Sequence, residues 1–554
     1  MDIKNLTPHG RGVRGLSLSR SSQLFSGPFG RIFRALSPAE FGNNDQENRQ
    51  NLATLGKAMV STRDDPKDGP DPEESGIPAL YTYLGQFVDH DLTFDPASSL
   101  QQQNDPDALV DYRTPKFDLD NVYGRGPDDQ PYLYEFTSGS DRAKFVLGSN
   151  LTGGWPSPPA FQAKDLPRNT ANLPANQPAR AIIGDPRNDE NALVSQLQGL
   201  FLRFHNRLID EGLIFADAQR TLRFHYQWML INDFLVALVN HATLEKVFPH
   251  LAKSKKSSIA DKPPVLTFYH QRNEAFMPLE FSVAAYRFGH SMVRPGYRLN
   301  DGDPDDKTKD TLLPIFGQDG PPTRPRSLRG FMAPASSWAL DWGRFIDIDD
   351  RPNGVILDDN GKTPNEKNPS PTELAQNRKR LQLAYRIDTS IVFPLGDLPD
   401  DVADKLIPSL AERNLVRGWR LRLPSGQAVA RAMGEEVLDP ILIGKFEDKP
   451  ETQNIEDINS VFEDNCPLWA YCLAETVNHT VPGHAGVNSR LLGAVGGRIV
   501  AETFAGLLVN DSQSFLSQDP RWTPEIGDGR TFGLKEFVRF ALGMKIDFKP
   551  RGRV

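Results

Sequence analysis

The sequence contains very little cysteine and no long apolar run. Only Cys466 and Cys472 occur among 554 residues. A separation of six places them on different faces of a helix, so we expect two free thiols, and no cysteine-based metal site or disulfide framework. No apolar stretch reaches the roughly 18 residues that cross a bilayer, and the N-terminus lacks the hydrophobic centre of a signal peptide. We therefore expect no membrane span, and either the cytoplasm or export without a cleavable signal.

An excess of positive charge is also missing. The net charge is −9, with 24% charged and 38% hydrophobic residues, which is typical of a soluble globular chain with a large core. Nucleic-acid-binding domains are usually basic, so we expect no nucleic-acid partner. The first 35 residues are the exception, because they carry six Lys and Arg residues and only one acid. We predict a basic, mobile arm over residues 1–40 and one domain over residues 41–554.

Helical periodicity dominates the rest of the chain. In LVSQLQGLFLRFHNRLIDEGL (193–213), for example, apolar residues recur every three or four positions. Strand signals are few and short, such as VLTFY (265–269), and no connector resembles a linker between two cores. The fold class that we predict is therefore mainly α, in one large domain with few short strands. The predicted helices cover 78–94, 191–212, 216–249, 281–294, 372–386, 426–435, 466–478, 488–509 and 534–543.

The first candidate site lies in GQFVDHDLTF (85–94), where Asp89, His90 and Asp91 are consecutive in a predicted buried helix. Successive side chains on a helix diverge by about 100°. His90 can therefore point into a cavity while the two acids point to either side of it. The alternative is two solvated acids beside a core histidine.

The second candidate is RTPKFDLDNVYG (113–124). Thr114, the backbone carbonyl of Lys116, Asp118 and Asp120 place an oxygen at every second residue. Such a loop can wrap a hard cation, which takes six to eight oxygen ligands, and Asp91 could supply a further one. An acidic surface turn is the alternative.

Two further segments carry isolated functional residues. In GDPRNDEN (184–191), Arg187 and Glu190 stand three residues apart immediately before a helix, where acidic residues also serve simply to start the helix. In AAYRFGHSMVRP (284–295), His290 lies in a mainly apolar helix. A histidine in this position is either a ligand or a packing residue.

These segments, in this order, resemble the animal haem peroxidases of the peroxidase–cyclooxygenase superfamily, as a soluble, bacterial-type member. GQFVDHDLTF is similar to the distal-histidine helix of that family and TPKFDLDNVYG to its calcium loop. GDPRNDEN and YRFGHSMVRP resemble the distal-arginine and proximal-histidine segments. RNLVRGWRLRLPSGQ (413–427) resembles the proximal-asparagine segment, and LLGAVGGRIVAETFAGLL (491–508) a late structural helix. The resemblance runs from about residue 75 to 545 and implies a large, mainly α, single-domain fold with haem between the distal and proximal helices.

The resemblance also implies a role for each matching residue. His290 would bind the haem iron, and Asn414 would hydrogen-bond its other ring nitrogen. His90 would be the distal base and Arg187 the distal cation, with Gln86 as a polar group of the distal pocket. The remaining implied roles are haem ester links at Asp89 and Glu190, a propionate partner at Arg417, and calcium ligands at Asp91, Thr114, Lys116, Asp118 and Asp120.

The implied activity is that of a haem b peroxidase. It would reduce hydrogen peroxide and oxidise small donors (phenol-like compounds, iodide, bromide or thiocyanate) through a ferryl intermediate. Asn191 stands where strongly chlorinating relatives have methionine, so we expect poor chloride oxidation. Arg287 occupies the position of the radical-forming tyrosine of the fatty-acid oxygenases. The two alternatives are such an oxygenase and a non-enzymatic, calcium-bound adhesion or matrix module.

Overall fold

The structure is a computed structural model that describes most of the chain between residues 29 and 550. Within that range, thirteen gaps are not described: 63–64, 94–112, 137–139, 154–162, 171–176, 253–256, 272–274, 303–309, 318–326, 350–371, 373–378, 400–406 and 445–451.

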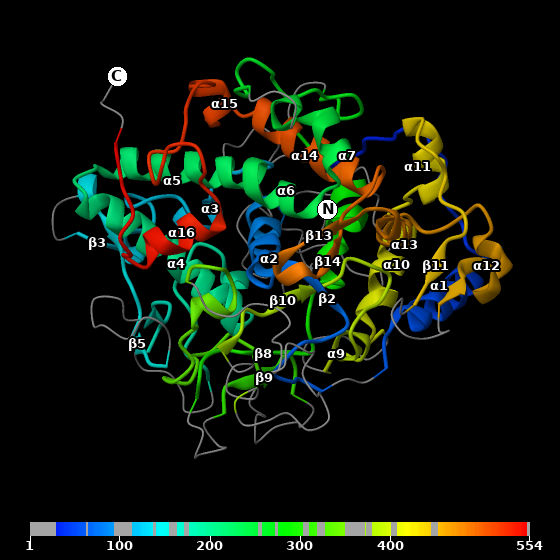
Figure 1. The fold of residues 1–554 in the computed structure, drawn as a ribbon, viewed down its shortest axis with the longest axis horizontal. Helices are drawn as coiled ribbons and strands as arrows, with labels where there is room; N and C mark the ends of the chain where they lie inside the picture. The colour runs from blue at the N-terminus through cyan, green and yellow to red at the C-terminus, as the bar shows by residue number, and fades with distance from the viewer. Residues whose placement is uncertain are drawn as a thin grey trace, which may run out of the picture.

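Helix α2 (Leu80–Leu92) lies near the middle of the molecule (Figure 1). Ten of its thirteen residues are buried. Phe87 stacks on Phe201 of α4 (Ala192–Asp210), with ring centroids 4.1 Å apart, and meets the edge of Tyr226 from α5 (Phe215–Met229). This aromatic packing fixes α2, and therefore the DHD triplet at its end, inside the core.

The helices around α2 follow the sequence pattern closely. Asn191 begins α4, because its side-chain oxygen accepts the N–H groups of Leu193 and Val194. After α5 the chain continues through a π-helical turn (Leu230–Phe234) into α6 (Leu235–Leu238) and α7 (His241–Val247). The single helix predicted over 216–249 is therefore broken before Asn240, which caps α7. The helices α14 (Gly496–Val509) and α16 (Leu534–Ala541) complete this side.

A second group of helices lies on the right-hand side of Figure 1. Here α1 (Asp45–Met59) packs against α10 (Leu410–Arg420). Neither helix was predicted, although Asn44 and Ser409 provide clear N-caps for them. The other helices with their bounds are α3 (Asp120–Tyr123), α9 (Phe393–Gly396), α11 (Gly426–Met433), α12 (Ile455–Ile458), α13 (Leu468–Ala474) and α15 (Phe515–Gln518).

Strands are few and short, as the sequence predicts, and the mainly α prediction is confirmed. Among the described residues every sheet has two strands, and only the first pair is parallel. The pairs are β1 (Phe29–Gly30) with β7 (Met277–Pro278), β2 (Glu74–Pro78) with β10 (Leu383–Tyr385), β3 (Tyr134–Glu135) with β4 (Lys144–Phe145), β5 (Asn150–Leu151) with β6 (Ala163–Lys164), β8 (Gly296–Arg298) with β9 (Leu312–Pro314), β11 (Leu442–Ile443) with β12 (Gln453–Asn454), and β13 (Thr480–Pro482) with β14 (Asn488–Arg490).

Three predicted segments are wrong, and each has a tertiary cause. Residues 488–490, predicted as the start of a helix over 488–509, form strand β14, which pairs with β13. The segment 383–385, predicted as part of a helix over 372–386, is strand β10, because it pairs with β2 while Arg380 binds the buried Glu74. The segment 265–269, predicted as a strand, is a loop. The N–H groups of its residues 267, 268 and 269 all donate to the buried carboxylate of Glu502 on α14, so they are not available to a neighbouring strand.

The end of the predicted N-terminal arm is docked on the core. Phe29 and Phe33 are buried, and the N–H groups of Ile32 and Phe33 donate to Glu280. Residues 1–28 lie outside the described range. Cys466 and Cys472 are buried free thiols, as predicted. In the described part of the chain, no helix has both the length and the apolarity needed to span a bilayer.

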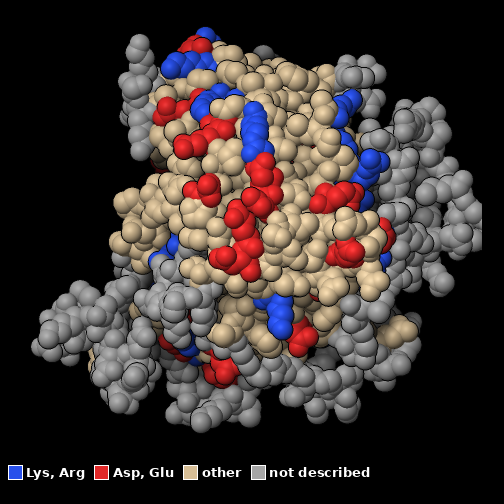
Figure 2. All heavy atoms as spheres, turned by 90° about the vertical axis from the view of Figure 1, so that its right-hand side faces the viewer, with Lys and Arg blue, Asp and Glu red and all other residues tan. Residues whose placement is uncertain are grey.

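One face of the molecule is distinctly acidic. Figure 2 shows Asp and Glu side chains in a band across the side that lies on the right in Figure 1. Exposed acids on α12 and the segment after it include Glu456, Asp457, Glu463 and Asp464. This face agrees with the net negative charge of the chain.

Candidate functional site

His90 lies near the end of α2, with only 5% of its surface exposed. Its Nδ1 atom is 2.7 Å from Oδ1 of Asn188, which belongs to a short 3₁₀ turn (Pro186–Asp189). Its Nε2 atom is 3.7 Å from Oε1 of Glu190. One ring nitrogen is therefore hydrogen-bonded within the core, and the other faces a carboxylate.

Glu190 is the carboxylate on this side of the imidazole. The Gln86 amide donates to it, and the Asn191 amide donates in turn to Oε1 of Gln86 at 3.1 Å. Desolvation raises the pKa of Glu190, while His90 and Arg187 lower it. Yet 33% of the side-chain surface is exposed. The carboxylate is thus surrounded by protein but is still partly accessible.

Arg187 lies beside the backbone of the same helix. Its guanidinium donates to the carbonyl of His90 at 2.9 Å and to Asp185 at 2.8 Å. Burial alone would raise the pKa of Asp185, but Arg187 and Arg113 hold it below its usual range. The predicted distal cation therefore shares its charge with a carboxylate, and it ties the 3₁₀ turn to the end of α2.

Asp89 is half-buried on the neighbouring face of α2 and accepts a hydrogen bond from the Thr93 hydroxyl at 3.2 Å. Its negative charge helps to raise the pKa values of Glu190 and Tyr286. Asp89 therefore lies close enough to Glu190 for the two charges to interact.

His290 ends an irregular helical segment. Residues 280–284 form a π-helical turn and residues 285–290 a 3₁₀ helix. Nδ2 of Asn414, on α10, lies 2.8 Å from Nδ1 of His290. Among the described residues, Nε2 of His290 has no hydrogen-bond partner. Burial and the Arg287 charge lower the pKa of His290 to about 3, so the imidazole stays neutral and can bind a metal.

Arg417 lies one helical turn after Asn414 on α10 and is half-buried. The structure thus places both predicted proximal-side residues of this segment on one helix, and it joins Asn414 directly to His290.

The helices that carry the two imidazoles touch each other. The Tyr286 hydroxyl, one turn before His290, donates to the carbonyl of Gly85 on α2 at 3.2 Å. A Cβ atom added to Gly289 would meet nothing within 4 Å, so there is open space next to His290. A neutral imidazole beside open space, opposite a second helix with an imidazole and an accessible carboxylate, fits a haem bound at His290.

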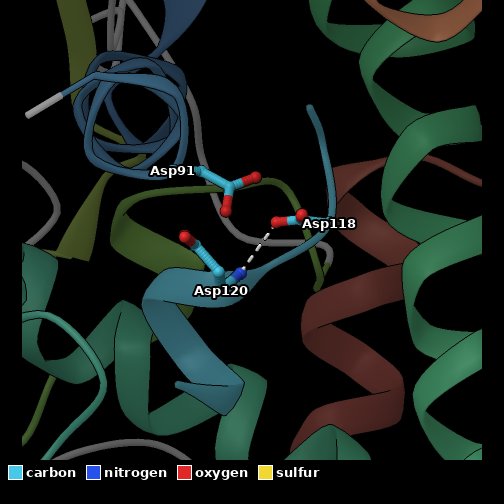
Figure 3. Close-up of side chains that lie close together, drawn as sticks. All are labelled: Asp91, Asp118 and Asp120. Atoms are coloured by element: carbon cyan, nitrogen blue, oxygen red, sulfur yellow. Dashed lines mark hydrogen bonds between the residues drawn. The ribbon is translucent and has the colours of Figure 1, made fainter. Parts of the chain in front are cut away.

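A separate cluster of carboxylates lies on the other side of α2. Ligand atoms of Asp91, Asp118 and Asp120 all lie within 4.8 Å of one another (Figure 3). The backbone N–H of Asp120 and the Thr114 hydroxyl donate to Asp118 at 3.1 and 2.7 Å. Burial and neighbouring acids raise the pKa values of Asp91 and Asp120, the latter to about 7, although Arg113 opposes the rise in both.

This cluster has the chemistry of a cation site. Oδ1 of Asp91 is buried without a hydrogen-bond partner, and burying an unpaired carboxylate oxygen is costly unless a cation meets it. Of the other predicted ligands, Thr114 borders the cluster. The side chain of Lys116 turns away toward Asp511, with Nζ 3.7 Å from Oδ1.

Sequence reasoning missed three contacts of the site. Asn188 binds His90, Asp185 binds Arg187, and Tyr226 of α5 donates its hydroxyl to Asp91 at 3.2 Å. The first two lie inside the quoted GDPRNDEN segment, so their positions next to Arg187 were a usable signal. Tyr226 lies 135 residues from Asp91, and nothing local marks it.

Comparisons with known proteins find similar sequences and a similar fold. The family model "Animal haem peroxidase" matches residues 97–318. The chain is 29% identical over 204 residues to chorion peroxidase of Aedes aegypti and 28% identical over 152 residues to dual oxidase of Drosophila melanogaster. These alignments cover 34% and 24% of this chain but only 23% and 9% of the two relatives. The fold is similar to peroxidase A of Dictyostelium discoideum, with a TM-score of 0.54, 16% identity and 90% of each chain covered.

Proposed function

Because residues 97–318 match the animal haem peroxidase family, we propose that this chain is a haem b peroxidase that uses hydrogen peroxide to oxidise small donors. The observation that carries the proposal is the pairing of two imidazoles on touching helices. His290 is neutral and bound at Nδ1 by Asn414, whereas His90 is bound at Nδ1 and turns Nε2 toward Glu190.

His290 is the residue that would hold the haem iron through Nε2. When bound, the haem supplies the redox chemistry of peroxide cleavage. Asn414 contacts Nδ1 of His290, so Nε2 is the ring nitrogen left for the haem. Iron binding at Nε2 requires the Asn414 amide to turn its oxygen toward Nδ1, because the NH₂ group that faces Nδ1 only donates and would leave the imidazole proton on Nε2. Arg417, one turn further along α10, is the proposed partner for a propionate.

His90 would move the proton on the distal side. Its Nε2 atom takes the proton from one peroxide oxygen and returns it to the other, the usual work of a histidine near neutral pH. Arg187 places positive charge beside the His90 backbone, where it offsets negative charge developing on the peroxide. Gln86, fixed by Asn191, holds Glu190 in place.

Asp91, Thr114, the Lys116 carbonyl, Asp118 and Asp120 are the proposed calcium ligands. The short distances among the three carboxylates and the unpaired Oδ1 of Asp91 support this assignment. Since Asp91 follows His90 directly on α2, a bound cation would also hold the distal helix in place. Metal analysis should find about one calcium per chain, and a chain with Asp118→Asn should lose it while Asp261→Asn, an exposed acid, should not.

Asp89 and Glu190 are the proposed sites of ester bonds to the haem. Acid–acetone extraction of peroxide-treated protein should leave haem on the chain, and the double variant Asp89→Ala, Glu190→Ala should release it. Complete extraction from the wild type would contradict ester formation.

Asn191 bears on the choice of donor. Its side-chain oxygen caps α4 and its amide binds Gln86, so no sulfur is available at this position for a further bond to haem. We expect iodide, bromide, thiocyanate and phenol-like donors to be oxidised and chloride to be a poor substrate. Initial rates with each donor at equal peroxide test this order, and a chloride rate equal to that of bromide would contradict it.

A further inference from the structure

The second ring nitrogen of His90 has a buried partner of its own. Nδ1 of His90 and Oδ1 of Asn188 are 2.7 Å apart, and the two residues are 5% and 0% exposed. Asn188 cannot easily move away. It belongs to a 3₁₀ turn that Asp185 caps by accepting the N–H of Arg187 at 2.8 Å.

The Asn188 amide has a second partner on the side away from His90. Its Nδ2 atom donates to Oε1 of Gln198 at 2.9 Å, and Gln198 is fully buried on α4. With the NH₂ group used in this way, the carbonyl oxygen is the atom that faces His90. A carbonyl oxygen only accepts hydrogen bonds, so the proton of the neutral imidazole resides on Nδ1.

We propose that Asn188, held by Gln198, is a positioning residue that fixes His90 in the tautomer with its proton on Nδ1. Nε2 then carries a free lone pair on the side of Glu190, where it can accept a proton. This inference rests on the proposed function for its importance, because His90 is the proposed proton acceptor. The tautomer itself is a property of the folded chain with or without haem.

Loss of this contact has a definite consequence. Without an acceptor, the buried Nδ1–H group would be unsatisfied, which is costly. The imidazole would then rotate, or its proton would shift to Nε2. In either case the nitrogen next to Glu190 would no longer be a free base.

The tautomer can be read directly in the haem-free protein. ¹⁵N shifts of histidine-labelled full-length chain at pH 8 separate the two tautomers, and the His90→Gln chain assigns the His90 signals. We expect protonated Nδ1 and unprotonated Nε2 in the wild type and in Asn188→Asp, which keeps an acceptor oxygen. Asn188→Leu should lose this pattern. A proton on Nε2 in the wild type, or an unchanged pattern in Asn188→Leu, would overturn the proposal.

The kinetic test uses the haem-loaded protein. Asn188→Leu should lower the rate constant of the optical change on mixing with peroxide by about 10- to 100-fold at unchanged haem content, and Asn188→Asp should stay within about threefold. Asn300→Leu, at another buried asparagine, controls for general loss of packing. If Asn188→Leu does not fold, Gln198→Leu serves as a second variant, because it removes the partner of the Asn188 amide. His90 should then show a mixture of tautomers. A single, unchanged His90 tautomer in Gln198→Leu would overturn the proposal.

The two proposals fail differently. If the wild type shows the expected tautomer but does not react with peroxide, the proposed function is wrong and the positioning role stands. If the wild type reacts and Asn188→Leu reacts equally fast, the positioning role is wrong.

Discussion

The two imidazoles of the site each contact an asparagine side chain at Nδ1, but through different atoms and in different surroundings. Oδ1 of Asn188 lies 2.7 Å from Nδ1 of His90, whereas Nδ2 of Asn414 lies 2.8 Å from Nδ1 of His290. His90 lies on a regular α-helix and faces Glu190, whereas His290 ends an irregular π and 3₁₀ segment beside Arg287. A nearby carboxylate suits an imidazole that carries protons, and a nearby cation suits one that stays neutral as a ligand. The two imidazoles therefore differ both in their charged neighbours and in the asparagine atom that each one contacts.

The largest expected effect is at His290. His290→Ala should lose haem, or bind it without its normal Soret band, because the imidazole that borders the open space at Gly289 is removed. Haem content after reconstitution measures this. His270→Ala, at an exposed histidine, is the matched control, and normal haem binding by His290→Ala would refute the ligand role.

The second largest effect is expected at His90. His90→Gln should keep haem but lower the rate of the peroxide reaction by about 10²- to 10⁴-fold, the usual contribution of a general acid–base group. Stopped-flow absorbance after mixing with peroxide gives the rate. Unchanged turnover at full haem content would remove His90 from the mechanism.

A smaller effect is expected when the asparagine on the proximal side is changed. Asn414→Leu should weaken haem binding or activity by about 10- to 100-fold, as is usual for residues that orient a metal ligand. Unlike Asn188→Leu, it should leave the ¹⁵N signals of His90 unchanged. If both variants alter the His90 signals equally, the separation between the two sides fails.

The last effect concerns stability and not activity, at a histidine outside the site. Burial lowers the pKa of His225 to about 3, against 6.5 without burial. Above pH 6.5 the imidazole of His225 is neutral in both the folded and the unfolded chain. Below pH 6.5 it binds a proton in the unfolded chain but stays neutral in the folded chain, so the free energy of unfolding falls as the pH falls toward 3. When the pH is lowered from 7.5 to 4.5, the free energy of unfolding should fall by about 2–3 kcal/mol less in His225→Gln than in the wild type. Urea titrations at the two pH values measure the difference, and parallel losses would contradict it.

Much of the fold could be predicted because long helices repeat their apolar residues regularly. The helices α2, α4 and α14 carry their own pattern, and the site segments carry theirs. The helix α10 was missed although Ser409 caps it and Ala411, Leu415 and Trp419 line its buried face. Its pattern is short and is interrupted by Arg413 and Arg417, so local periodicity did not reveal it.

Other features depend on contacts that are distant in the sequence. The strand β10 consists of good helix formers, and only its pairing with β2 and the bond between Arg380 and Glu74 hold it extended. The π and 3₁₀ turns before His290 are likewise set by packing, since Glu280 binds the N-terminal segment and the Trp469 indole donates to the Arg287 carbonyl. Such features are decided by tertiary contacts, which a local pattern does not contain.

The most direct test of the account is the absorption spectrum of the purified chain after addition of hemin, before and after one equivalent of hydrogen peroxide. We expect a Soret band that saturates at one hemin per chain and shifts on addition of peroxide, then returns when a phenol-like donor is supplied. A spectrum that remains that of free hemin would contradict the central claim that His290 binds a haem facing His90.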